Sequence, residues 1–389
     1  MGRLAAVLTL SLLLPVQDLD QRRDELSARL QKLRGLPWKS AVTLREGTRR
    51  EYAAYVLENA KRVYGSDLSA AEKGLKALGL IPPKLRLDAA LTAQAGLGVK
   101  VFASGGEILL LDPKAGDEWI LNKMDLALVD QHYKAPAAAT FDAQMAWAAL
   151  RMGDAEVVKH LIWTSSRITG ETVKKVAEET AAWEKGDSKL ASAVAPRIFV
   201  RGADFPWRRG AVFALTQYAA GRLDAAYARP PVSTEQVLHP EKYAANELPV
   251  VIDPSDVDGF LTSRGYACIY KTTLGELGVA LVLETHFPRE DLTSVSEGWG
   301  GDVFLVYEKE GAVPLVLWIT EWDSLEDAVE FQAQAFRLMK RVLPADSELA
   351  APALRQKTGV VFGVNVPKDL QDELLAAAWK CKRTPARTY

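Results

Sequence analysis

The stretch ILNKMDLALVDQHY, residues 120 to 133, decides how the first half of the chain is interpreted. Its apolar side chains recur every three or four residues and run into a polar end, which is the pattern of an amphipathic helix. A helix turns once in about 3.6 residues, so positions 122 and 126 face the same side. The spacing therefore predicts a helix that presents these two side chains to one site.

The sequence on either side of this stretch is also predicted to be mainly helical. In DQRRDELSARLQKLRG, the side chains of Leu26, Leu30 and Leu33 fall on one helix face. Two short apolar runs around Gly105-Gly106, within residues 99–112, predict a β-hairpin. Further helices are expected over 141–163, 169–186 and 207–221.

A helix start is predicted in the turn-rich segment PPVSTEQVLHPEKY, residues 230–243. Ser233 is a good N-cap residue, and Gln236 stands three residues later, which completes the spacing of a capping box. His239 precedes Pro240 in the same segment. We expect a structural hydrogen bond for this histidine.

From about Leu248 the pattern changes to short β-rich runs. These are YACIYK, GVALVLE, DVFLVYE and VPLVLWIT, separated by Gly, Pro and charged residues. A helix is expected over 324–343, with Val329, Phe336, Met339 and Leu343 along one side, followed by the strand TGVVFGVNV and a last helix to Trp379. The fold class is therefore α+β, with a mainly helical domain over 18–247 and a smaller domain with antiparallel strands over 248–389.

Composition excludes some classes of partner. The 389 residues are 48% hydrophobic and 25% charged, the formal net charge is -2, and Lys and Arg are dispersed along the chain. Nucleic-acid-binding proteins show a basic patch or stripe. We therefore expect no nucleic-acid partner.

The first 17 residues predict export. A cationic start at Arg3 precedes an apolar run from Leu4 to Leu14 and then a polar break, as in a secretory signal peptide. Eleven residues are too few for a span, which needs about 20, so no transmembrane segment is expected in the mature chain. The alternative is a buried first helix.

The two cysteines leave the redox state open. Cys268 and Cys381 are the only cysteines in the chain, and no C-x-x-C motif occurs. An exported protein could join them in a disulfide, whereas two buried free thiols are the alternative.

Several stretches resemble one known family. LNKMDLALVDQHY resembles the active-site helix of a bacterial family of exported zincin-like metallopeptidases of the gluzincin type, which reads roughly H-E-L-x-H-A-L-x-D-Q-H-F. The matching tail is Ala127, Leu128, Asp130, Gln131, His132 and Tyr133. The stretches PPVSTEQVLHPEKY, LGELGVALVLE, GWGGD and EWDSLEDAVEF are similar to later parts of the family, so the resemblance covers most of the chain beyond the leader.

The residues that the family uses for catalysis are replaced. Aligned from the tail, Asn122 and Leu126 stand at the two zinc-binding histidines and Lys123 at the general-base glutamate. The third ligand belongs to an E-G-D-A motif, which stands here as M-G-D-A with Met152 at the ligand position. Asn is a poor zinc ligand, Leu is none, and the Met thioether favours softer metals. A protonated lysine cannot act as the base and repels a cation, unless its side chain extends to solvent.

The resemblance therefore implies a pseudopeptidase with no metal and no other cofactor. Its candidate cleft residues are Asp130, His132, Asp154 and His239. A family of this kind grips extended peptides along an edge strand, which the hairpin at 99–112 could supply. We expect an exported protein that binds a peptide or an envelope protein without cleaving it.

Three alternatives stay open. The helix need not descend from a metal site, and Asn122, Leu126 and Met152 would then be ordinary residues. The chain could be a hydrolase with a relocated or non-zinc site that uses His132 or His239. It could also be a structural protein whose old cleft is filled by side chains. For the other two histidines, we expect His160 on a surface face and His286 in a loop after a strand.

Overall fold

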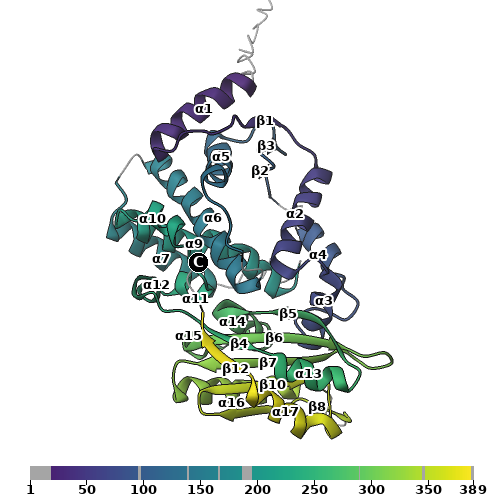
Figure 1. The fold of residues 1–389 in the computed structure, drawn as a ribbon. Coiled ribbons are helices and arrows are strands. Elements are labelled where there is room, and N and C mark those ends of the chain that lie inside the picture. The colour runs from purple at the N-terminus through teal and green to yellow at the C-terminus, as the bar shows by residue number, and fades with distance from the viewer. Residues whose placement is uncertain are drawn as a thin grey trace, which may run out of the picture.

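The computed structural model describes residues 19–94, 98–137, 140–164, 167–185, 195–288, 290–343 and 347–386. Figure 1 shows a helical part at one end and a sheet with its own helices at the other. This arrangement is α+β with mainly antiparallel strands, as the sequence predicts. The predicted signal peptide lies outside the described residues.

The first part of the chain is helical around a small sheet. Its helices are α1 (Leu19–Arg34), α2 (Arg49–Tyr64), α3 (Leu68–Ala77), α4 (Leu87–Gln94), α5 (Asp117–His132), α6 (Phe141–Thr164), α7 (Gly170–Lys185), α9 (Arg197–Ala219), α10 (Leu223–Ala228), α11 (Thr234–Leu238) and α12 (Pro240–Ala245). The long helices α6 and α9 pack along each other in the middle of the molecule (Figure 1). α9 begins ten residues before the predicted helix and contains Pro206.

The predicted hairpin is confirmed. β2 (Val101–Ser104) and β3 (Glu107–Leu110) pair around Gly105 and Gly106, whose φ angles of 60° and 83° suit the tight two-residue turn. β1 (Thr43–Glu46) adds to β3 in parallel, giving the order β1-β3-β2. β2 is therefore an edge strand.

The second part is built on a five-stranded sheet. Its order is β5-β6-β7-β10-β9, and every neighbouring pair is antiparallel. The elements are β4 (Val250–Asp253), α13 (Ser255–Ser263), β5 (Ala267–Thr272), α14 (Gly275–His286), α15 (Thr293–Glu297), β6 (Trp299–Glu308), β7 (Leu315–Trp322), α16 (Leu325–Val342), β8 (Leu349–Ala350), β9 (Ala353–Gln356), β10 (Gly359–Val364), β11 (Val366–Pro367), the 3₁₀ turn η1 (Lys368–Leu370), α17 (Gln371–Lys380) and β12 (Lys382–Pro385).

One predicted strand is wrong. GVALVLE lies in α14, where Val279, Leu281, Val282 and Leu283 are all buried. A short, continuous apolar run fits a buried strand and a buried helix equally well, because its periodicity is hidden. His286, expected in a loop after a strand, is consequently the last residue of this helix.

The largest hydrophobic core joins the two parts of the chain. It contains side chains of α6 and α9 together with side chains of α14, β6, β7 and α16. A second core lies on the other face of the five-stranded sheet, under α13 and α17. A third core lies between α1, the small sheet and α5. The predicted domain boundary at 247/248 falls between α12 and β4, and the largest core crosses it.

Of the four residues that the sequence places along one side of α16, Met339 and Leu343 pack against the largest core, whereas Val329 and Phe336 face solvent. The side chains of Val329 and Phe336 are 47% and 41% exposed. The buried side consists of Ala328, Phe331, Ala335 and Leu338. The sequence carries apolar residues at helical spacing on both sides, so periodicity alone could not decide which one packs.

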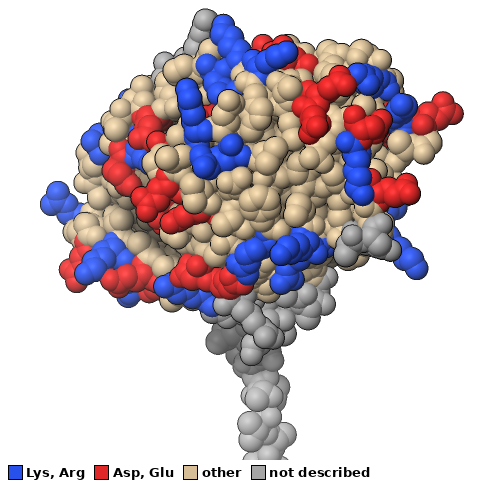
Figure 2. Space-filling view, turned by 90° about the horizontal axis from the view of Figure 1, so that it is seen from below, with Lys and Arg blue, Asp and Glu red and all other residues tan. Residues whose placement is uncertain are grey.

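Over the face shown in Figure 2, Lys and Arg side chains are interspersed with Asp and Glu. Within the described ranges, no helix combines the length and the apolar character that crossing a membrane requires. Cys268 is exposed, Cys381 is buried, and they are not bonded to each other.

Candidate functional site

The two positions aligned with zinc-binding histidines are enclosed by protein. Asn122 and Leu126 on α5 are 3% and 5% exposed. The Asn122 amide donates to the Ala155 carbonyl oxygen at 3.0 Å and to Glu156 Oε1 at 3.4 Å, both on α6. The amide therefore ties two helices together, and Leu126 offers only hydrocarbon.

Lys123, at the position of the general base, packs on an aromatic ring. Its Nζ lies 3.9 Å from the centroid of the Trp207 ring on α9 and donates to Asn122 Oδ1 at 3.0 Å. Burial lowers the pKa of Lys123 to about 7, although the nearby Glu156 opposes this shift. The ammonium group is thus held between α5, α6 and α9 by a cation–π contact and a hydrogen bond.

The third ligand position belongs to a tight helix crossing. Met152 is half-buried, and the next residue, Gly153, faces α9. A Cβ at Gly153 would stand 2.0 Å from the Gly210 carbonyl oxygen, and a Cβ at Gly210 would stand 2.3 Å from the Ala149 carbonyl oxygen. Only glycine permits this approach of α6 and α9, so the G of the M-G-D-A motif has a packing role.

Asp154 lies in a buried ion cluster, away from solvent. Its Oδ2 accepts from Arg34 Nη2 at 2.8 Å and from the Tyr227 hydroxyl at 2.9 Å. Asp125 lies beside the same guanidinium, with 3.3 Å between its Oδ1 and Arg34 Nε. Burial, together with the charge of Asp154, raises the pKa of Asp125 well above its ordinary value. One arginine therefore serves two buried aspartates, and Asp125 is the one that favours a proton.

Sequence reasoning missed Arg34 and Tyr227. Arg34 is the last residue of α1, 120 positions before Asp154, and no local pattern links them. The one available signal was Asp125, a carboxylate in the middle of an apolar helix face. A buried carboxylate requires a partner, and Arg34 supplies it from a distant part of the sequence.

Asp130 and His132 hold the end of α5. Asp130 is exposed and forms an ion pair with Arg151 of α6. A ring nitrogen of His132 lies 2.7 Å from the Pro37 carbonyl oxygen and so anchors the end of α5 to the segment after α1. Neither residue shares a partner with Asp154. The candidate residues do not form one cleft.

His239 is bonded as predicted, to a buried acid. Its Nε2 lies 3.0 Å from Glu276 Oε1 on α14. The hydrogen bond to Glu276 raises the pKa of His239, while burial raises the pKa of Glu276. The other oxygen of Glu276, Oε2, is buried without a hydrogen-bond partner in the structure.

The predicted helix start at Ser233 is confirmed in part. The Ser233 side chain accepts from the Gln236 backbone N–H at 3.3 Å, as an N-cap does. The reciprocal bond of the predicted capping box is displaced by one residue, because Gln236 Oε1 accepts from the Val232 backbone N–H at 2.9 Å.

The remaining histidines are half-buried: His160 lies on α6, and His286 Nε2 lies 2.7 Å from the Leu78 carbonyl oxygen.

One group of acids has the spacing of a metal site. Among the described residues, Glu235, Glu247 and Asp323 form the single cluster of three or more potential ligands. The Lys242 ammonium contacts all three carboxylates, at 2.6, 3.1 and 2.7 Å. A lysine thus supplies the positive charge there, and the cluster is an ion-pair network.

The start of α14 is surrounded by buried acids. Asp142 accepts from the Thr234 backbone N–H at 2.7 Å, and burial raises its pKa to about 7. Asp302 accepts from the backbone N–H groups of Leu274 and Gly275 at 3.0 and 2.9 Å, and burial raises its pKa to about 6. These carboxyls connect α6, α11, α14 and β6.

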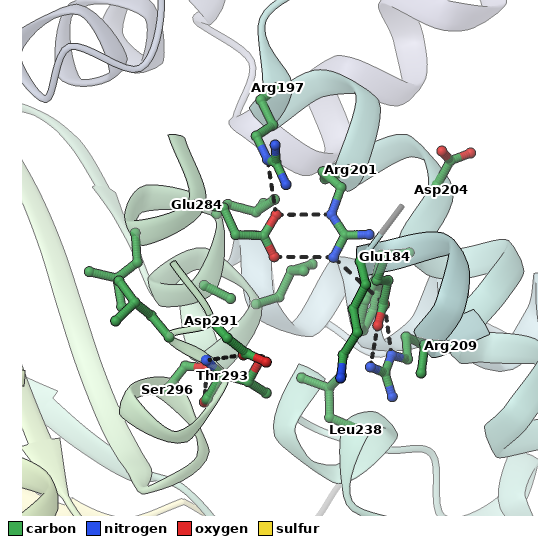
Figure 3. A pocket seen from close by; sticks show the side chains of 18 of the residues that line it. Glu184, Arg197, Arg201, Asp204, Arg209, Leu238, Glu284, Asp291, Thr293 and Ser296 are labelled. Carbon is green, nitrogen blue, oxygen red and sulfur yellow. Dashed lines mark hydrogen bonds and ion pairs between the residues drawn. The ribbon is translucent and has the colours of Figure 1, made fainter. Parts of the chain in front are cut away.

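A large cavity borders α9. It encloses about 790 Å³ between α7, α9, α14 and α15. Arg201 donates to both oxygens of Glu284, at 2.9 and 3.1 Å, and so joins α9 to α14 across the cavity (Figure 3). Arg209 pairs with Glu184 and joins α9 to α7. The wall carries both signs of charge and an apolar side, formed in part by Leu277 and Leu281.

The edge strand β2 lies against α5. Val101 and Ile108 pack in one core with Ile120, Leu121 and Met124 of α5. In a two-residue hairpin, the residues that flank the turn form a hydrogen-bonded pair, and pairs alternate from there. The bond from the Leu111 N–H to the Lys100 carbonyl oxygen fits this alternation. The N–H and C=O of Ala103 therefore point to the free edge, where this residue is half-buried.

One family model matches part of the chain. The model "Domain of unknown function (DUF8575)" matches residues 268–370, from β5 to the end of η1. No curated protein and no solved structure matches the chain.

Proposed function

We propose that this protein is an exported, non-catalytic relative of zincin-like peptidases that binds an extended peptide beside α5. The carrying observation is that β2 is an edge strand of the small sheet in the described part of the chain and lies next to the helix that would hold the zinc ligands. An extended peptide can pair with such an edge through backbone hydrogen bonds.

The replaced residues support binding without cleavage. Asn122 is bonded to α6, Lys123 packs on Trp207, and Leu126 is buried. Zinc peptidases need three protein ligands and a base around one metal ion. Purified protein expressed with added zinc should contain well below one zinc per chain, and a stoichiometric, tightly held zinc would overturn this proposal.

The peptide site can be tested by removing one N–H from the edge. Ala103→Pro deletes a donor that points away from β3, so the β2–β3 ladder should persist. Peptides selected from a displayed library against the natural chain should bind this variant at least about tenfold more weakly, the equivalent of one lost hydrogen bond.

A matched control lies on the opposite edge of the same sheet. β1 bonds β3 through Thr43, Arg45 and Gly47, so Glu46 points outward. Glu46→Pro likewise removes an outward-pointing backbone N–H, at an exposed edge residue, and should leave peptide binding unchanged. Equal loss in both variants, or no loss in Ala103→Pro, would place the peptide elsewhere.

One observation favours a second candidate, a hydrolase with a relocated site. Glu276 lines the 790 Å³ cavity and is hydrogen-bonded to His239, a pair that can exchange protons. This candidate requires turnover of a chromogenic ester or peptide that resists chelators and falls in both His239→Ala and Glu276→Gln. Absence of turnover in the natural chain would remove it.

A further inference from the structure

α16 carries two apolar seams, and one of them faces solvent. The buried residues Ala328, Phe331, Ala335 and Leu338 follow a spacing of three and four. A second set of residues with alternating spacing of three and four is exposed: Glu326, Val329, Ala333, Phe336 and Lys340. Such a three-four repeat is the seam through which helices pair as coiled coils.

The charged ends of the exposed seam lie symmetrically about Ala333. Glu326 and Lys340 lie seven residues to either side of it, and the apolar side chains of Val329 and Phe336 lie between. Ala333 is the smallest residue of the seam, which permits close approach at a crossing point. Leu325, 54% exposed, extends the apolar surface at one end.

The charges of this face are complementary to the same face turned around. Glu326 and Glu330 are exposed in the first half of α16, and Lys340 and Arg341 are exposed in the second half. For the described part of the chain, Glu326 and Lys340 have no ion-pair partner within the molecule. Two antiparallel copies would place each acidic half against a basic half.

We propose that this seam of α16 is the interface of a homodimer, in which two copies pair antiparallel about a two-fold axis near Ala333. Val329 of each copy then packs against Phe336 of the other copy, and Glu326 meets Lys340 at both ends. A C2 interface is self-complementary in this way. The helix is about 27 Å long, so the contact is small and the dimer should be a weak one.

Charge reversal with rescue tests this interface. The full chain is followed by sedimentation velocity over a concentration series that reaches roughly 100 μM, the range where weak dimers form. Glu326→Lys puts two like-charge contacts into the dimer by symmetry and should weaken dimerisation about tenfold. The double variant Glu326→Lys with Lys340→Glu restores opposite charges at both ends and should recover the dimer.

The control applies the same charge change elsewhere. Glu310 is exposed in the turn between β6 and β7, far from the seam in the sequence, and Glu310→Lys should leave dimerisation unchanged. A chain that stays monomeric throughout the series overturns the proposal. So does a dimer that ignores Glu326→Lys, or one that the double variant fails to restore.

Discussion

Replacing Tyr227 by Phe should measure how much the buried ion cluster contributes to stability. The Tyr227 hydroxyl donates to Asp154 Oδ2 at 2.9 Å, and Asp154 is 0% exposed. Phe keeps the ring and removes only this donor. Hydrogen bonds to charged groups contribute about 1.5–3 kcal/mol, because the buried acceptor then loses a partner it cannot replace with water.

The structure also predicts how this loss depends on pH. The bond from Tyr227 lowers the pKa of Asp154 against the stronger effect of burial, which raises it. The bond therefore stabilises the carboxylate more than the protonated acid. The destabilisation by Tyr227→Phe should be largest at neutral pH and should shrink in acid, once Asp154 carries a proton.

Tyr133 supplies a matched control. Its ring stacks on Tyr227, with 4.3 Å between centroids, and no hydrogen bond joins its hydroxyl to Asp154. Tyr133→Phe removes the same atom from the neighbouring ring and should change stability by less than about 0.5 kcal/mol. In a thermal scan of a chain of 389 residues, Tyr227→Phe should lower Tm by about 2–4 °C. Equal Tm values for the two variants would refute the argument.

Asp142, Gly153 and Lys123 give three further testable expectations. Burial raises the pKa of Asp142 to about 7, so this residue stabilises the fold in acid and loses that contribution as the pH rises from about 4 through 7. Asp142→Asn should therefore flatten this part of a plot of urea midpoint against pH. An unchanged slope would contradict the assignment. Gly153→Ala should destabilise the chain by more than about 3 kcal/mol, because its Cβ would meet the Gly210 carbonyl oxygen at 2.0 Å. A soluble variant with the Tm of the natural chain would disprove the close contact of α6 and α9. Lys123→Met should bind no zinc. It should also retain the fold, since it keeps a hydrocarbon side chain against Trp207. A variant that is already unfolded at the start of a urea titration would show that the ammonium group itself is required.

The stretches that local chemistry governs were predictable. The hairpin at Gly105-Gly106 and the cap at Ser233 depend on residues within a few positions of each other. The helix over α5 was predicted as amphipathic; the helix is present, but residues on nearly all of its sides are buried. Propensity, capping and turn conformation act between sequence neighbours, so they are readable without the fold. The resemblance to zincin-like peptidases and the export signal remain predictions.

The remaining features were decided by tertiary contacts. GVALVLE forms a helix whose apolar side chains are almost all buried against α9, α6 and the sheet, and this continuous apolar run hides the helical period. α16 has apolar residues on two sides, and only the position of the sheet determines that Phe331 is buried and Phe336 is exposed. Arg34 neutralises Asp154 from 120 residues away. Burial and ion pairing depend on which distant segments meet, so the sequence by itself determined the elements with clear local signals, and the packing determined the rest, including which faces are core, cluster or open surface.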